Sequence, residues 1–231
     1  MKRLLLISNS KMHDQAYLDH AADEIQKLLG NIKTIVFVPY ALADRDTYAA
    51  VARERFAKMD ITLTSVHEEK SAQNVVAHAE AMFIGGGNTF RLLDALYKNK
   101  LIEVIRKKVS AGMPYIGSSA GSNVAGQTIK TTNDMPIIYP PSFDALQLVA
   151  FNINPHFIDA DPNSKHMGET REQRIKEFHE ENDTPVMGLR EGAMLQVDNE
   201  KVYLKGTTGA KVFMKSEEPR EYTSGELLHL S

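Results

Sequence analysis

Short apolar runs alternate with longer amphipathic segments along most of the chain. The apolar runs predict strands at residues 3–8, 33–39, 61–66, 81–84, 113–117, 151–155 and 185–189. The amphipathic segments predict helices at residues 14–29, 46–59, 71–79, 89–98, 100–110 and 169–181, with a short helix from residue 120. Strands and helices in alternation are typical of an α/β fold.

The predicted strands are apolar throughout rather than alternating, as in Thr-Ile-Val-Phe-Val at residues 34–38. Strands that are buried on both sides have this composition. We therefore expect a mostly parallel sheet with helices on both faces. Apolar residues recur at helical spacing over residues 14–29, and Gly30 follows as a C-terminal cap would.

After Gly192 the pattern changes to three short strands at residues 194–197, 201–204 and 211–214. Turn-forming residues connect them, which predicts antiparallel hairpins at the end of the chain. The chain contains no internal repeat, low-complexity stretch or linker, so we expect one domain over residues 1–231.

Composition excludes several classes of function. With 42% hydrophobic and 25% charged residues and a formal net charge of −3, the chain has no global basic field, so nucleic acid is not an expected partner. It has no cysteine, which rules out disulfides, a thiolate metal site and a cysteine nucleophile. The apolar start is too short for a signal peptide, and no run approaches the roughly 18 residues of a membrane span. We expect a cytoplasmic protein without membrane contact, metal or cofactor.

The strongest candidate for chemistry is residues 117–121, which read Gly-Ser-Ser-Ala-Gly at the end of a predicted strand. This G-x-S-x-G pattern, placed between a strand and a helix, exposes a serine hydroxyl on a sharp turn. Ser119 is therefore the candidate nucleophile. Such patterns also occur in ordinary turns, so a base and an acid are needed to support this interpretation.

His156 is the favoured base because it follows residues 151–155 at the C-terminal end of a predicted strand, where open α/β sheets bind ligands. His166, in a polar loop, is a weaker candidate. The other histidines are expected to be ordinary surface residues: His13, His20, His67, His78, His179 and His229.

Two carboxylates compete for the role of orienting the base. Glu191 follows the predicted strand 185–189, and Asp134 lies in a polar turn between the serine and the histidine. Chain order does not decide between them, because the same triad geometry occurs with several orders. Without catalysis, Glu191 is an exposed turn residue and Asp134 a turn former before a proline.

A third element is the run Gly85, Gly86 and Gly87 after the predicted strand 81–84. With Asn88 or Thr89 opening a helix, these glycines present backbone N–H groups to an anion. The run is compatible with a phosphate cradle, half of an oxyanion hole, or a plain turn and helix cap. It lacks the Lys-Ser/Thr of a P-loop, which makes a nucleotide site less favoured.

Five segments in the same order closely resemble the peptidase E family of α-aspartyl dipeptidases. They are residues 85–90, 115–123, 131–136, 153–157 and 168–175. The likeness extends from the first strand to about Gly192. It implies a serine exopeptidase that releases N-terminal aspartate from Asp-Xaa dipeptides, on a fold related to class I glutamine amidotransferases. Those enzymes use cysteine where this chain has Ser119.

The resemblance implies Ser119 as nucleophile, His156 as general base, and either Glu191 or Asp134 as the third member, of which we favour Glu191. It also implies an oxyanion hole from the N–H groups of Ala120 and of Gly86 or Gly87. Ser118 departs from the aromatic residue expected in some relatives, which leaves the shape of the adjacent subsite open.

Recognition of an aspartyl side chain calls for a guanidinium group, and Arg171 is the candidate. Its alternative role is a surface ion pair with Glu172 or Glu177. Asp134 or Glu169 is expected to hold the substrate's α-amino group. Two alternatives stay open: a cyanophycinase-like peptidase acting on β-aspartyl links, and a non-catalytic binder of small anions. The expected partner is a small peptide, and both a monomer and a homodimer are compatible with the sequence.

Overall fold

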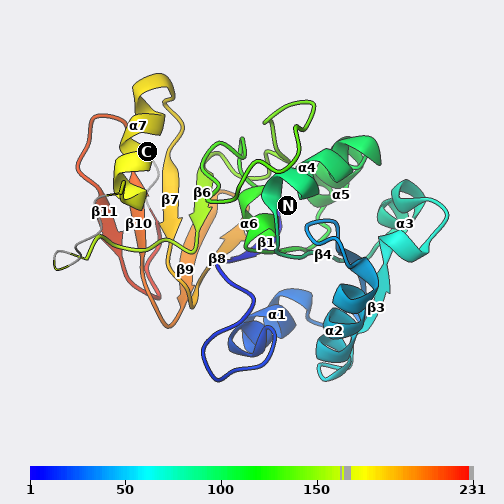
Figure 1. Cartoon of the computed structure of the whole chain (residues 1–231). Helices are drawn as coiled ribbons and strands as arrows, with labels where there is room; N and C mark the ends of the chain where they lie inside the picture. Colours follow the sequence, from blue (N-terminus) through cyan, green and yellow to red (C-terminus); the bar gives the residue numbers. More distant parts are fainter. Residues whose placement is uncertain (162, 164–167, 229–231) are drawn as a thin grey trace.

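The computed structural model describes residues 1–161, 163 and 168–228. Strands in this part of the chain form two sheets (Figure 1). The larger sheet has seven strands in the order β3-β2-β4-β5-β1-β8-β9. Their bounds are β1 Arg3–Ile7, β2 Thr34–Val38, β3 Thr62–Ser65, β4 Met82–Ile84, β5 Tyr115–Ser118, β8 Ala193–Asp198 and β9 Lys201–Gly206.

The larger sheet is parallel from β3 to β1 and becomes antiparallel at β8 and β9. This confirms the predicted α/β class with a mostly parallel sheet. The parallel strands all end at the same edge, so the loops that follow β4 and β5 lie next to each other. The predicted glycine loop and the predicted nucleophile therefore share one edge of the sheet.

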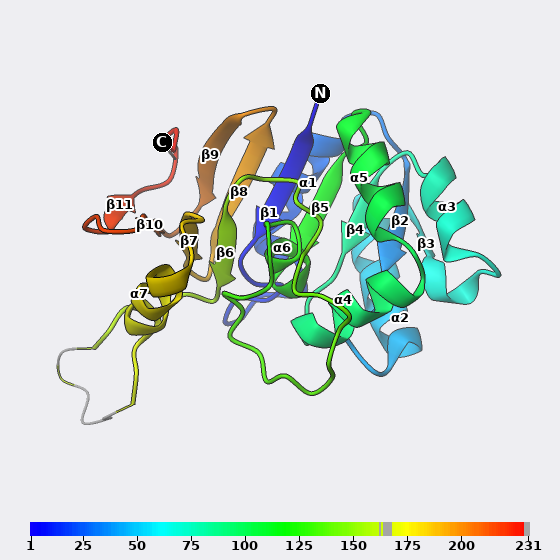
Figure 2. The ribbon, with the colours of Figure 1, turned by 90° about the horizontal axis from the view of Figure 1, so that it is seen from above.

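Helices cover both faces of the larger sheet (Figures 1 and 2). They are α1 Ala22–Leu29, α2 Arg45–Ala57, α3 Ala72–His78, α4 Thr89–Lys98, α5 Ile102–Ser110 and α6 Ala120–Asn123, with 3-10 turns η1 Asp19–Ala21 and η2 Val66–Glu68. Successive side chains of β1 point to opposite faces. Leu5 belongs to the core that α1 and α2 cover, and Leu4 belongs to the core under α3, α4 and α5.

The smaller sheet has the order β11-β10-β7-β6. Its strands are β6 Asn152–Pro155, β7 Val186–Leu189, β10 Ala210–Phe213 and β11 Arg220–Tyr222. β6 and β7 are parallel, while β10 is antiparallel to both β7 and β11. Two strands of the sequence prediction, 151–155 and 185–189, thus belong to this sheet and not to the larger one.

Helix α7, Arg171–Glu181, covers the smaller sheet through Ile175, which packs in a cluster with Phe157, Val186 and Phe213. Thr170 caps the N-terminus of the helix in a capping box. The Thr170 side chain accepts a hydrogen bond from the Gln173 N–H, and the Gln173 side chain accepts one from the Thr170 N–H. The cap explains why the helix begins two residues after the predicted start at residue 169.

Two sequence predictions need correction. The helix predicted over residues 14–29 begins only at Ala22, because Asp14 and Leu18 have φ values of 58° and 56° that interrupt a right-handed helix. Of the predicted C-terminal hairpins, only β8–β9 forms. The connection at 207–209 instead carries the chain from the larger sheet to the smaller one, because β10 pairs with β7.

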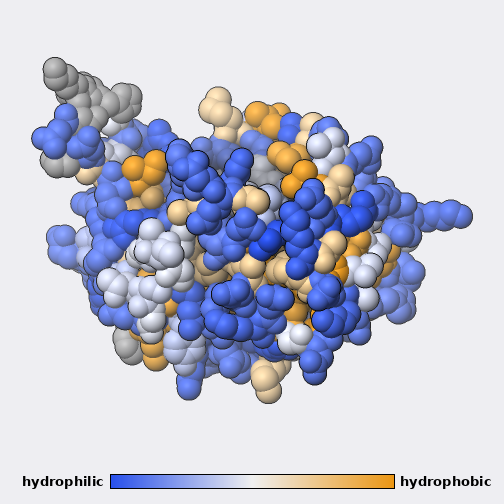
Figure 3. Space-filling view, turned by 90° about the horizontal axis from the view of Figure 1, so that it is seen from below, coloured by the Kyte–Doolittle hydropathy of each residue, from blue (hydrophilic) through white to orange (hydrophobic). Residues whose placement is uncertain are grey.

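On the face seen in Figure 3, hydrophilic residues predominate and hydrophobic ones occur in small separate groups. Among the described residues, no helix combines the length and the apolar character that crossing a membrane requires.

Candidate active site

Ser119 lies on the turn between β5 and α6, with φ 52° and ψ −110°. Its N–H donates to the carbonyl of Ile7 over 2.9 Å, which ties the turn to the end of β1. Gly121 lets α6 lie close to the end of β4, since a Cβ there would lie 2.1 Å from the Ile84 carbonyl oxygen. The predicted strand-turn-helix setting of the serine is therefore present.

The His156 ring lies between Ser119 and Glu191. Its Nε2 is 2.9 Å from Ser119 Oγ, and its Nδ1 is 2.7 Å from Glu191 Oε1. The side chains of His156 and Glu191 are 39% and 56% exposed, so the set is open to small molecules. With its proton on Nδ1, the ring donates to Glu191 and presents a free lone pair to the serine hydroxyl.

Ser8, at the end of β1, fixes the position of this histidine. Its hydroxyl donates to the Leu189 carbonyl over 2.7 Å and accepts the His156 N–H over 2.9 Å. The adjacent Asn9 side chain accepts the N–H of Gly192 over 2.8 Å. Sequence reasoning missed both residues, although a polar pair directly after a buried strand at the ligand-binding edge is a usable signal.

Asp134 is not in contact with His156. Its carboxylate accepts the N–H of Thr89 over 2.7 Å and the Thr89 hydroxyl over 2.5 Å, at the first residue of α4. The Thr132 hydroxyl is a third donor at 3.2 Å. Of the two predicted orienting acids, the structure therefore brings only Glu191 to the histidine.

The glycine loop 85–87 passes close to the serine. A Cβ on Gly86 would lie 2.9 Å from Ser119 Cβ, and one on Gly87, where φ is +132°, would lie 2.6 Å from the Ala41 carbonyl oxygen. Burial raises the pKa of Tyr48, whereas hydrogen bonds with Tyr17 and with the Gly86 backbone lower it. No backbone carbonyl in the described part of the chain accepts the N–H of Gly87 or Ala120. These two groups are therefore the better placed of the predicted oxyanion donors.

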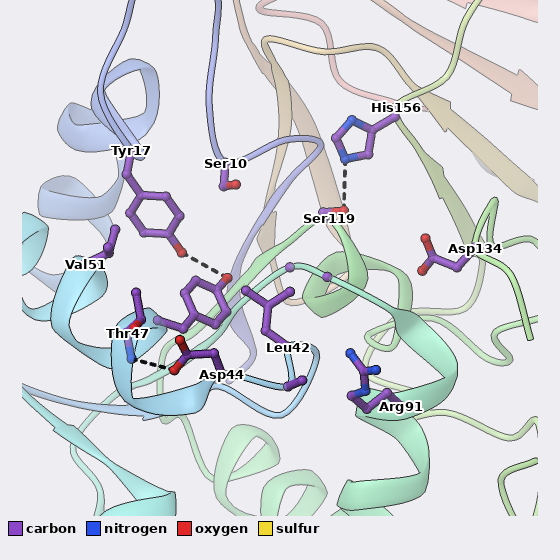
Figure 4. A pocket seen from close by; sticks show the side chains of 14 residues that line it. Ser10, Tyr17, Leu42, Asp44, Thr47, Val51, Arg91, Ser119, Asp134 and His156 are labelled. Carbon is purple, nitrogen blue, oxygen red and sulfur yellow. Dashed lines mark hydrogen bonds between the residues drawn. The ribbon is translucent and has the colours of Figure 1, made fainter. Parts of the chain in front are cut away.

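A cavity of about 870 Å³ opens over the serine and the histidine (Figure 4). Its lining is Ser10, Tyr17, Leu42, Ala43, Asp44, Thr47, Tyr48, Val51, Gly86, Gly87, Arg91, Ser119, Asp134 and His156. Ser118 is fully buried and is not part of this lining, so it does not shape the cavity directly. Sequence reasoning missed Tyr17, Tyr48 and Arg91, which come from helical or loop segments without a motif.

Arg171 and Glu169 line a separate cavity of about 430 Å³. Burial lowers the pKa of Arg171, Arg174 lowers it further, and the charge of Asp134 acts in the opposite direction. Among the described residues, Arg171 forms no ion pair with Glu172 or Glu177, and Glu172 pairs with Lys176 at 3.0 Å. Arg171 thus faces the same region as Asp134, while Glu169 contacts Arg174 at 3.4 Å.

The remaining histidines are less uniform than predicted. His179 is buried and its Nε2 contacts the Thr184 carbonyl at 3.0 Å, because the apolar side of α7 turns inward. The His67 side chain is only 10% exposed and contacts Asp46. His166 and His229 lie outside the described residues. Within those residues, no three His, Cys, Asp or Glu side chains are grouped to hold a metal ion.

Comparison with known proteins gives consistent results. Residues 4–205 match peptidase family S51. The chain is 50% identical over 222 residues to peptidase E of Streptomyces coelicolor, covering 96% of this chain and 91% of the relative. It is 47% identical over 215 residues to a protein of Drosophila melanogaster named as a probable alpha-aspartyl dipeptidase, covering 92% and 90%. A crystal structure of a peptidase from an acI-B1 actinobacterium shares the fold, with a TM-score of 0.74 at 16% identity over 99% of this chain and 96% of that one.

Proposed function

This chain belongs to peptidase family S51, and we propose that it is a serine exopeptidase in which Ser119, His156 and Glu191 release aspartate from Asp-Xaa dipeptides. The observation that carries the assignment of residues is the 2.9 Å approach of His156 Nε2 to Ser119 Oγ. A serine hydroxyl needs such a base, since it is too weak an acid to ionise at neutral pH.

In the acylation step, Ser119 Oγ attacks the carbonyl carbon of the aspartyl residue while His156 Nε2 takes the hydroxyl proton. The imidazolium then gives this proton to the leaving amine as the C–N bond breaks. Glu191 keeps the ring in orientation and stabilises its positive charge. Water attacks the resulting ester by the same route and releases free aspartate.

The negative charge of each tetrahedral intermediate develops on the former carbonyl oxygen. The N–H groups of Ala120 and Gly87 are proposed to receive it, with Gly86 holding the loop through Tyr48. Donors of this kind are positioned before the reaction begins, and the loss of one costs about 2.7–4 kcal/mol of activation free energy.

Asp134 and Arg171 are the residues proposed to recognise the substrate's first residue. Arg171 has no carboxylate in an ion pair within the described part of the chain, so its guanidinium is available to the aspartyl side chain. Asp134 or Glu169 supplies negative charge for the α-ammonium group. A dipeptide with a free N-terminus satisfies both charges.

Replacement of the nucleophile tests the proposal. Ser119→Ala should abolish release of aspartate from Asp-Leu and lower kcat by about 10⁴-fold or more, because no other group forms the acyl-enzyme. A fluorophosphonate probe should label the wild type and not the variant. Ser110→Ala, at the exposed end of α5, is the matched control and should keep full activity. Activity retained by Ser119→Ala would refute the assignment.

The substrate is tested with a small panel. Asp-Leu should be hydrolysed far faster than Leu-Leu and faster than β-Asp-Arg. Hydrolysis of Leu-Leu as fast as that of Asp-Leu would contradict the role of Arg171. A preference for β-Asp-Arg would favour the cyanophycinase-like alternative. The absence of both turnover and probe labelling would favour a non-catalytic anion binder. The cytoplasmic location expected from the sequence is a separate proposal that cell fractionation tests.

A further inference from the structure

Arg91 is the one arginine or lysine among the described residues that line the cavity over Ser119. It comes from the first turn of α4, directly after the glycine loop. Figure 4 shows its side chain beside Leu42 and below Asp134. The cavity that contains the reacting serine therefore carries one arginine side chain.

This guanidinium group has no carboxylate partner in the described part of the chain. Its one side-chain hydrogen bond is a long contact of 3.5 Å from Nη1 to the Ala41 carbonyl. By contrast, Arg53, Arg55 and Arg106 each form an ion pair with a carboxylate. Arg91 is thus half-buried with most of its donors unused, which suits an anionic ligand.

The other charged groups of the cavity are both acidic and both engaged. Asp44 accepts the Thr47 N–H at the start of α2, and Asp134 is held by Thr89. Hydrogen bonding from Thr47 lowers the pKa of Asp44, which keeps it negative. A second carboxylate entering the cavity is repelled by these two groups, so Arg91 is the position where it is stabilised.

The side of the cavity away from Asp134 carries exposed apolar side chains beside Asp44 and Thr47. Leu42 and Val51 are 38% and 41% exposed there, and Tyr17 stands beside them. Exposed apolar side chains in a cavity favour an apolar group of the ligand. This side therefore suits the second residue of the peptide, the one that leaves with the amine.

An Asp-Xaa dipeptide has two carboxylates, one on the aspartyl side chain and one at the C-terminus. With Arg171 assigned to the first, we propose that Arg91 binds the C-terminal carboxylate while the side chain of the second residue lies against Leu42 and Val51. This inference rests on the proposed function. It predicts a preference for dipeptides over tripeptides, since a third residue would move the carboxylate away from Arg91.

A matched pair of substrates tests the proposal: Asp-Leu and its C-terminal amide, which lacks only the carboxylate charge. Arg91→Ala should lower kcat/KM for Asp-Leu by about 10- to 100-fold, mainly through a higher KM, because the carboxylate loses a charge-assisted partner in ground and transition state alike. For the amide, kcat/KM should change by no more than about twofold. Arg91→Lys should recover part of the loss, since it keeps the charge without the planar fork.

Lys98→Ala is the control on the same helix, because Lys98 pairs with Asp94 and lies outside the cavity lining. Thermal unfolding checks that each variant is folded. Equal losses on both substrates would assign Arg91 a structural role and overturn the inference, as would unchanged activity on both. A wild type that hydrolyses no aspartyl peptide would instead refute the proposed function, so the two failures are distinguishable.

Discussion

Ser119 and His156 both have a backbone conformation that non-glycine residues rarely adopt, with φ values of 52° and 53°. Each such residue costs about 1–3 kcal/mol and persists only where the surrounding structure imposes it. In both cases a hydrogen bond from the residue's own N–H holds the turn, to the Ile7 carbonyl and to Ser8 Oγ respectively. The strained turns direct the hydroxyl and the imidazole toward each other.

At this scale, two carboxylate-to-amide substitutions separate the acid that orients the base from the acid that binds substrate. Glu191→Gln should lower kcat by about 10²- to 10⁴-fold with little change in KM, because the neutral amide neither selects the Nδ1–H tautomer nor stabilises the imidazolium. Asp134→Asn should mainly raise KM, by about tenfold, because it removes the charge opposite the α-ammonium group.

Steady-state kinetics on Asp-Leu measure both effects. Glu200→Gln is the matched control, because Glu200 is exposed in the turn at the far end of β8. A large loss of kcat in Asp134→Asn together with near-normal kcat in Glu191→Gln would reverse the two assignments.

At the scale of elements, charged side chains connect the strands of the smaller sheet. Arg190, directly after β7, contacts Asp159 at 2.6 Å and also Glu221 of β11. Lys211 of β10 contacts the same Asp159 carboxylate at 2.8 Å. Hydrogen bonding from Arg190 lowers the pKa of Asp159 to about 2, from an ordinary value of 3.8. The network holds the segment after β6, which carries His156, against β7, β10 and β11.

Asp159→Asn should therefore reduce stability in a pH-dependent way. The ionised carboxylate stabilises the folded state above about pH 3.8, and this contribution declines as the pH falls through about 2. Because the Asp159 side chain is 42% exposed, solvent screens its ion pairs. The substitution should therefore lower the free energy of unfolding at pH 7 by about 1 kcal/mol, which corresponds to about 2–4 °C in Tm.

Thermal unfolding at pH 7 and pH 2.5 measures this difference, which should fall below half at the lower pH. Asp60→Asn is the control, since Asp60 is exposed and forms no ion pair within the described residues. A Tm difference that stayed the same at both pH values would show that the carboxylate charge does not stabilise the fold.

At the scale of the whole molecule, the candidate triad is assembled from two sheets. Ser119 follows β5 of the larger sheet, whereas His156 follows β6 of the smaller one. Glu191 lies where the chain passes from β7 to β8, between the two sheets. Catalytic geometry therefore depends on how the sheets dock, and Ser8 is a direct link between them.

Ser8→Ala should lower both stability and turnover. The His156 N–H loses its acceptor, and the Leu189 carbonyl keeps the Phe157 N–H but loses its second donor, which should reduce the free energy of unfolding by about 1–3 kcal/mol. The displaced imidazole should lower kcat on Asp-Leu by about 10- to 100-fold. Urea unfolding and steady-state kinetics measure the two quantities.

Ser65→Ala provides the comparison, because Ser65 is equally buried but bonds to His67 at the far edge of the larger sheet. It should lose stability with kcat unchanged. If Ser8→Ala behaves in the same way, then Ser8 contributes to folding without positioning the base.

Much of the fold was predictable from local pattern. Apolar runs such as residues 34–38 form strands because a strand buried on both faces needs that composition. The α-helix predicted over residues 14–21 was wrong, since the helical spacing of apolar residues does not reveal the left-handed conformation of Asp14 and Leu18. The hairpin expected between residues 201–204 and 211–214 does not form, because partner choice between strands depends on contacts distant in sequence.

Sequence reasoning alone predicted the α/β class, the strand ends that carry Ser119, His156 and Glu191, and the family to which the chain belongs. These follow from local composition and from short motifs, whose physics extends over a few residues. Tertiary structure alone decided that Glu191 and not Asp134 reaches the imidazole, that Ser8 joins the two sheets, and that Arg91 faces the cavity. Each of these depends on distances between segments up to 181 residues apart, which packing sets and sequence spacing does not.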